Sequence, residues 1–101
     1  MQISAVRLTF HLPHAASLKS KRQVSRSLIS RLRKKFNVSA AEVDGTDRWQ
    51  TLVVGVAFVS NAHQHADHVM DLVLNYVQSL HLDAELVDVD RDTIGGMEPE
   101  G

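Results

Sequence analysis

The sequence contains no cysteine, so disulfide bonds, thiolate metal sites and cysteine nucleophiles are excluded. Only 2 of the 101 residues are proline and 5 are glycine, in a composition that is ordinary for a folded globular domain. No apolar run approaches the roughly 18 to 20 residues of a membrane-spanning helix. The N-terminus also lacks the basic and apolar regions of a signal peptide. We therefore expect one cytoplasmic domain with a single hydrophobic core and no membrane association.

Acidic residues are absent from the first 41 residues, which contain nine Lys or Arg. The remaining part of the chain contains two Lys or Arg and all twelve acidic residues, so a net charge of −1 conceals about +9 in one part and −10 in the other. Such asymmetry indicates either a basic surface that meets an anionic partner or two surfaces of one fold that attract each other.

Six elements of secondary structure are predicted from the spacing of the apolar residues. Strands are expected over 2–12, 37–44, 49–60 and 82–92, and helices over 18–36 and 62–80, with Ser17 and Asn61 as the N-caps. The order β-α-β-β-α-β predicts an α+β fold, the ferredoxin-like sandwich. Its four-stranded antiparallel sheet has the order 4-1-3-2, with both helices on one face. We expect residues 1–92 to form this domain and residues 93–101 to be a flexible tail.

The predicted helix over 18–36 carries eight of the eleven basic residues of the chain. At about 100° per residue, its apolar residues share one side and most of its cations lie away from it. A basic surface about 22 Å long can follow several phosphates of a nucleic-acid backbone. The candidate nucleic-acid-binding residues are Lys19, Lys21, Arg22, Arg26, Arg33 and Lys34. The alternative is a solvated basic surface that is attracted to the acidic last strand.

The stretch His63-Gln64-His65-Ala66-Asp67-His68 has the HxHxDH spacing of the metal-binding loop in metallo-β-lactamase-like hydrolases. Those enzymes use further ligands from distant loops, whereas this chain has only His81 as a later histidine. On a helix, His65 and His68 share a face, but His63 is turned about 160° from His65. We therefore expect solvated histidines in the first turns of a helix, with His65 and His68 as no more than a weak metal site.

No spacing in the sequence matches a Ser-His-Asp triad or a glycine-rich phosphate-binding loop. We therefore predict no catalytic residue and no cofactor, and we do not expect an enzyme. A sheet of this kind invites comparison with the RNA-recognition motif, but the strands supply no aromatic platform on which bases would stack. The apolar face of the sheet instead suggests a self-complementary homodimer. The candidate interface residues are Ile3, Ala5, Trp49 and Val53, although a packing anchor at the end of a strand is the simpler role for Trp49.

A set of short motifs resembles the YlxP-like proteins, a small bacterial family known as domain of unknown function 503. The motifs are SLKxKR over 17–22, FNVS over 36–39, AEVD over 41–44, Trp49-Gln50, Val59-Ser60-Asn61 and Ala66-Asp67. The resemblance covers residues 1 to about 92 and implies the ferredoxin-like fold. Members of the family are often encoded beside translation factors and a ribosome-binding factor, which implies an association with ribosomes or RNA. No catalytic residues are established for the family, so the resemblance implies none here.

The sequence thus favours a small, non-enzymatic binding protein that associates with RNA or the ribosome through a basic helix. The alternative is a protein-interaction module that uses the apolar sheet face for a second copy or another protein. The remote alternative is a metal-dependent hydrolase built on the histidine cluster.

Overall fold

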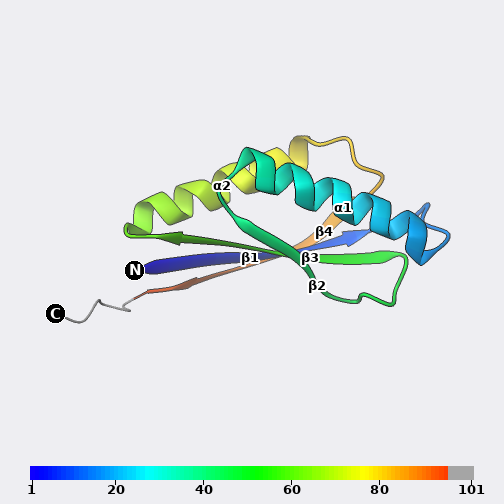
Figure 1. The fold of residues 1–101 in the computed structure, drawn as a ribbon, viewed down its shortest axis with the longest axis horizontal. Coiled ribbons are helices and arrows are strands. Elements are labelled where there is room, and N and C mark those ends of the chain that lie inside the picture. Colours follow the sequence, from blue (N-terminus) through cyan, green and yellow to red (C-terminus); the bar gives the residue numbers. More distant parts are fainter. Residues whose placement is uncertain (96–101) are drawn as a thin grey trace.

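A computed structural model describes residues 1–95, except for the side chain of His63. The elements are β1 (Gln2–His11), α1 (Leu18–Lys35), β2 (Ser39–Asp44), β3 (Thr51–Ser60), α2 (His63–Ser79) and β4 (Glu85–Ile94). Their order along the chain is the predicted β-α-β-β-α-β (Figure 1). None of the helices in this described part is long and apolar enough to cross a membrane.

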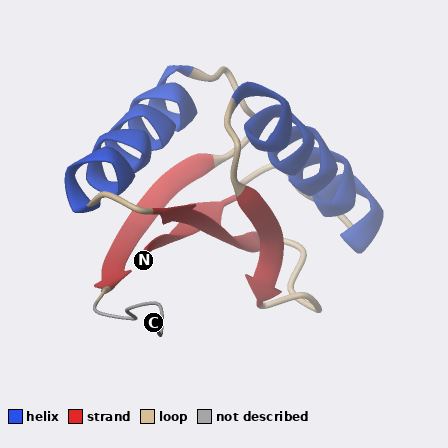
Figure 2. Ribbon diagram, turned by 60° about the vertical axis from the view of Figure 1, so that its left-hand side comes forward, coloured by secondary structure: helices blue, strands red, loops and turns tan. Residues whose placement is uncertain are grey.

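The four strands form one antiparallel sheet in the order β2-β3-β1-β4. Counted from the β4 edge, this is the predicted order 4-1-3-2, so the ferredoxin-like fold is confirmed. Both helices cover the same face of the sheet, and the other face is open (Figure 2). In the register of the sheet, β1 pairs with β3 from Gln2↔Ser60 to His11↔Thr51. On its other side β1 pairs with the acidic last strand β4, from Ile3↔Ile94 to His11↔Glu85.

The hydrophobic core lies between the sheet and the two helices. Every second residue of β1 points into it, which explains the alternation seen in the sequence. On α1 and α2 the buried residues recur at three- and four-residue spacing, the period of a helix that buries one side. The buried hydrophobic residues include Val6, Leu8 and Phe10 of β1, Leu28 and Leu32 of α1, and Ala66, Met70, Val73 and Val77 of α2.

Several predicted boundaries differ from the structure. Strands β2, β3 and β4 begin at Ser39, Thr51 and Glu85, two to three residues after the predicted starts. Helix α2 begins at His63 with Ala62 as its N-cap and no side-chain capping bond, so Asn61 is not the cap. Strand β4 extends to Ile94, two residues past the predicted end of the domain, because Thr93 and Ile94 pair with the first residues of β1. Sequence alternation does not reveal such an extension, since the neighbouring strand supplies the hydrogen bonds. Residues 96–101 of the predicted tail lie outside the described residues.

Candidate functional site

Helix α1 is well defined at both ends. At its start, the Ser17 hydroxyl accepts a hydrogen bond from the backbone N–H of Ser20 at 3.2 Å, and the Ser20 hydroxyl accepts one from the Ser17 N–H at 3.2 Å. At its end, the Phe36 N–H donates to the Leu32 carbonyl at 3.0 Å. Basic residues fill the last turn, where they interact favourably with the negative end of the helix dipole.

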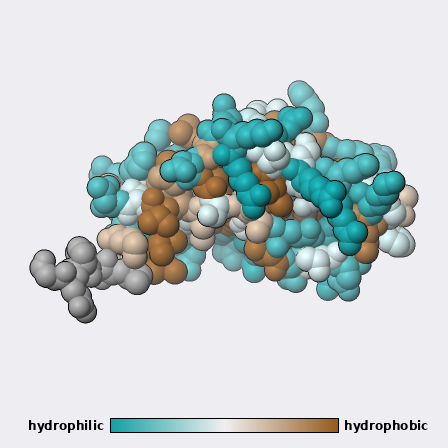
Figure 3. Space-filling view, in the orientation of Figure 1, coloured by the Kyte–Doolittle hydropathy of each residue, from teal (hydrophilic) through white to brown (hydrophobic). Residues whose placement is uncertain are grey.

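One side of α1 forms a basic stripe, which we define as Lys19, Arg22, Arg26 and Arg33. At 100° per residue these four positions fall within a sector about 60° wide. All four are exposed, as is the neighbouring Lys34. Hydrophilic side chains gather along α1 in the space-filling view (Figure 3). The structure therefore brings five of the six predicted nucleic-acid-binding residues together on one surface.

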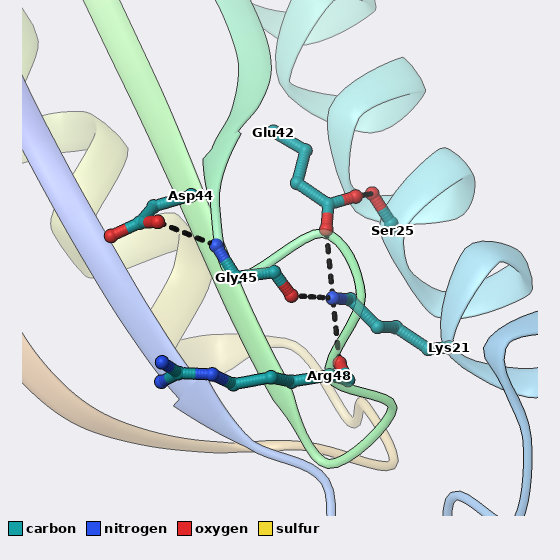
Figure 4. A network of polar contacts seen from close by, with 6 residues as sticks. All are labelled: Lys21, Ser25, Glu42, Asp44, Gly45 and Arg48. Carbon is teal, nitrogen blue, oxygen red and sulfur yellow. Dashed lines mark hydrogen bonds and ion pairs between the residues drawn. The ribbon is translucent and has the colours of Figure 1, made fainter.

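The sixth predicted residue, Lys21, is buried, and its assignment to the binding surface is wrong. Only 1% of its surface is exposed. The ammonium group donates to the carbonyl oxygens of Gly45 at 2.6 Å and Arg48 at 2.7 Å, and it lies 2.8 Å from Glu42 Oε1 (Figure 4). The two carbonyl oxygens accept hydrogen bonds from the ammonium, and the Glu42 carboxylate balances its charge as an ion pair. Lys21 thus fastens the connection between β2 and β3 to the first turn of α1.

The helical period contains a signal for this buried lysine. Lys21 lies four residues before Ser25, seven before Leu28 and eleven before Leu32, which is the spacing of one helix side. All three of those residues are buried. The Ser25 hydroxyl also lies 3.5 Å from Glu42 Oε2, so it helps to hold the carboxylate that pairs with Lys21. Sequence reasoning missed this pattern, in which a lysine shares one helix side with core leucines and the next strand carries an acidic residue.

Arg33 links the basic stripe to the sheet. Its guanidinium donates to the Ala40 carbonyl of β2 at 2.6 Å, which leaves other N–H groups of the fork available. A shallow groove runs between α1 and β2 beside this contact. The groove is lined by Arg26, Ile29, Ser30, Arg33, Lys34, Ala41 and Glu42. Three of these residues are cations, so the groove favours an anionic occupant.

The acidic strand β4 lies at the edge of the sheet opposite to β2, about 14 Å away at 4.8 Å per strand spacing. Helix α1 packs against β2 and β3. The ion pairs found for β4 join Asp90 to Arg7 at 3.1 Å and Arg91 to Asp71 at 2.7 Å. Within residues 1–95, no ion pair engages Lys19, Arg22 or Arg26. Internal pairing with β4 therefore does not account for the basic stripe.

The four predicted interface residues do not form one patch. Ile3 and Ala5 lie on the open face of the sheet, opposite Val59 and Ala57 of β3. Val53 shares that face but is only 7% exposed in the single chain, so the expectation that it offers surface to a partner is wrong. Trp49 precedes β3 and lies beyond the opposite end of the sheet from Ile3.

The histidine cluster is part of α2, as the sequence predicted. His65 and His68 are both exposed, and the His65 ring packs edge-to-face on Phe58 with 5.4 Å between ring centroids. Among the described side chains, no three His, Cys, Asp or Glu residues are grouped so that they could hold a metal ion. The geometry therefore provides no support for the hydrolase alternative.

The fold and the exposed basic helix define a small α+β domain of the ferredoxin-like class. Residues 3–91 match the family described as protein of unknown function (DUF503), and the chain belongs to this family. Over 65 residues the chain is 37% identical to the uncharacterized protein YlxP of Bacillus subtilis (strain 168), a match that covers 64% of this chain and 71% of that protein. The resemblance inferred from the sequence motifs is thereby confirmed.

Proposed function

We propose that this protein is a non-enzymatic, cytoplasmic binding protein that associates with RNA or the ribosome through the basic stripe of α1. The observation that carries the proposal is the separation of charge in the fold. The cations of the stripe are exposed and lack ionic partners in the described chain, while the acidic strand lies at the opposite edge of the sheet. An unneutralised row of Arg and Lys binds phosphate groups, and Arg does so through a bidentate fork.

The test is to measure RNA binding as a function of salt for the unmodified protein and for the double variant Arg22→Glu/Arg26→Glu. Each lost phosphate contact lowers the slope of log K against log salt by about 0.7 for single strands and 0.9 for duplexes. The double variant removes two such contacts, so we expect its slope of log K against log salt to be smaller in magnitude by about 1.4 to 1.8. It should also bind RNA at least about tenfold more weakly at low salt.

The matched control is Arg31→Glu/Lys35→Glu, which changes the net charge equally on the same helix. These positions are turned about 120° and 160° from Lys19, away from the stripe. The control should retain most of the affinity, and circular dichroism should show that both variants fold. Absence of RNA binding at low salt, or equal losses in the two double variants, would contradict the proposal.

A second candidate function is self-association through the open sheet face. An apolar row crosses three strands there, because Ile3 pairs with Val59 on one side and with Ile94 on the other. Val59 is 61% and Ile94 is 54% exposed, which is unusual for residues in a sheet. A second copy would cover this row. Sedimentation should then give the mass of a dimer for the unmodified protein and of a monomer for Val59→Lys, and a monomer at all concentrations would dismiss this candidate.

A further inference from the structure

The connection between β2 and β3 is held in place from two sides. Lys21 binds the carbonyl oxygens of Gly45 and Arg48, and the Arg48 N–H donates to the Gly45 carbonyl at 3.0 Å. On the other side, the Leu12 N–H donates to the Gln50 carbonyl at 2.9 Å. Gly45 has φ of 61°, a conformation that glycine adopts without steric cost. The backbone on both sides of Trp49 is therefore fixed.

The side chain of Trp49 is half-exposed on this fixed backbone, with 49% of its surface accessible. A tryptophan that only anchors the end of a strand buries most of its ring, whereas about half of the surface of Trp49 stays open to solvent. In the described part of the chain, Trp49 has no aromatic stacking partner. Its neighbours Arg48 and Gln50 are exposed too. An aromatic ring that is half open to solvent on a fixed backbone is suited to stacking, because little backbone freedom is lost when a planar group packs on it.

The same contact connects the loop that carries Trp49 to the helix that carries the basic stripe. Lys21 ties the residue before Trp49 to the first turn of α1 (Figure 4). Lys19 and Arg22, on either side of Lys21 in the sequence, are exposed. The start of α1 and the β2–β3 connection lie at one end of the molecule in Figure 1. An exposed aromatic ring and a row of cations at one end of a protein are the combination by which proteins hold single-stranded nucleic acid, with bases on the ring and phosphates on the cations.

We propose that Trp49 stacks on an unpaired base of an RNA whose phosphates lie along the start of the basic stripe. This inference rests on the proposed function and narrows the ligand class to single-stranded RNA. Bases inside a duplex are already stacked on one another. A duplex therefore presents phosphates to the basic stripe but no unpaired base on which Trp49 could stack. Removal of a stacking ring typically weakens single-strand binding about 5- to 150-fold.

The experiment uses the fact that Trp49 is the only tryptophan of the chain, so its fluorescence reports on this position alone. A short single-stranded RNA and a duplex of the same sequence are each titrated into the protein at low salt. Anisotropy of a dye on the RNA measures affinity independently. We expect the single strand to quench Trp49, and Trp49→Ala to weaken single-strand binding about 5- to 150-fold with duplex binding unchanged. Trp49→Phe keeps an aromatic ring and should retain most of the affinity.

Three outcomes would overturn the inference. Single-stranded RNA that binds by anisotropy without quenching, and equally well to a folded Trp49→Ala, would refute stacking but leave the role of α1 intact. Equal losses for single strand and duplex in Trp49→Ala would show that the ring is not specific for unpaired bases. Absence of binding to either RNA would refute the proposed function together with this inference.

Discussion

Replacing Lys21 with methionine removes the buried ammonium group and keeps an unbranched side chain in its place. The substitution deletes the two hydrogen bonds to the carbonyls of Gly45 and Arg48 and the contact with Glu42 Oε1. Removal of one partner of a buried ion pair costs about 3 to 5 kcal/mol, because the other charge is left without compensation. Three features place the expected loss at the lower end of this range. Glu42 keeps 19% of its side chain exposed, the Gly45 carbonyl keeps the Arg48 N–H, and Arg48 is exposed to water.

We therefore expect Lys21→Met to lower the free energy of unfolding by about 3 kcal/mol. At about 4 °C per kcal/mol for a domain of this size, the melting temperature should fall by about 12 °C. Adding Glu42→Gln should restore about 1 kcal/mol, since it removes the orphaned carboxylate. The matched control is Lys19→Met, which removes an exposed ammonium two residues away and should change stability by less than about 0.5 kcal/mol.

Urea denaturation followed by far-ultraviolet circular dichroism measures these differences, and Trp49 fluorescence reports on the β2–β3 connection in the same samples. The reasoning is refuted if Lys21→Met matches Lys19→Met in stability. It is also refuted if the second substitution at Glu42 adds a full further loss, because the two residues would then be independent.

Two further predictions concern the scaffold. A Cβ at Gly55 would approach Val43 Cγ1 to 2.8 Å, so Gly55→Ala should cost about 1 kcal/mol in the unmodified protein. In a Val43→Ala background, Gly55→Ala should be neutral or stabilising, because it then only reduces the conformational freedom of the unfolded chain. Equal effects of Gly55→Ala in both backgrounds would exclude the steric explanation. Ser17→Ala should cost about 1 kcal/mol by removing the N-cap of α1, whereas Asn61→Ala, beside a helix without a side-chain cap bond, should change stability little in the same urea titrations. Comparable losses at the two positions would contradict the assignment of the caps.

The fold could be predicted from the sequence because the apolar residues of β1, α1 and α2 recur with the period of the strand or helix that they form. Strand β1 alternates since only one of its faces meets the helices, and α1 and α2 bury one side each. The end of β4 could not be predicted this way. Its last residues, Thr93 and Ile94, are ordered by pairing with β1, and their burial pattern is exposed throughout.

The candidate site was predictable only in part, because charge alone does not state which side of a helix a residue occupies. Lys19 and Lys21 are both lysines of one short motif, but they lie about 160° apart on α1. Lys19 is exposed to solvent, whereas only 1% of the surface of Lys21 is accessible. The sequence offered Trp49 as an interface residue or a packing anchor, and its half-exposed state could not be predicted for a different reason. The backbone before Trp49 is held by the tie between Lys21 and the β2–β3 connection, a contact between residues more than 20 positions apart.

The segment 17–22 therefore combines three tasks within less than two helical turns. Ser17 and Ser20 cap α1, Lys21 fastens the β2–β3 connection, and Lys19 and Arg22 face solvent. Under the proposed function, a variant that neutralises all its cations would lose stability and RNA binding together, so it would not identify an RNA contact. Lys21→Met separates these effects, because its ammonium is buried and cannot touch RNA. If that ammonium positions Trp49, the folded variant should weaken binding of single-stranded RNA more than binding of the duplex, whereas a loss of charge would weaken both alike.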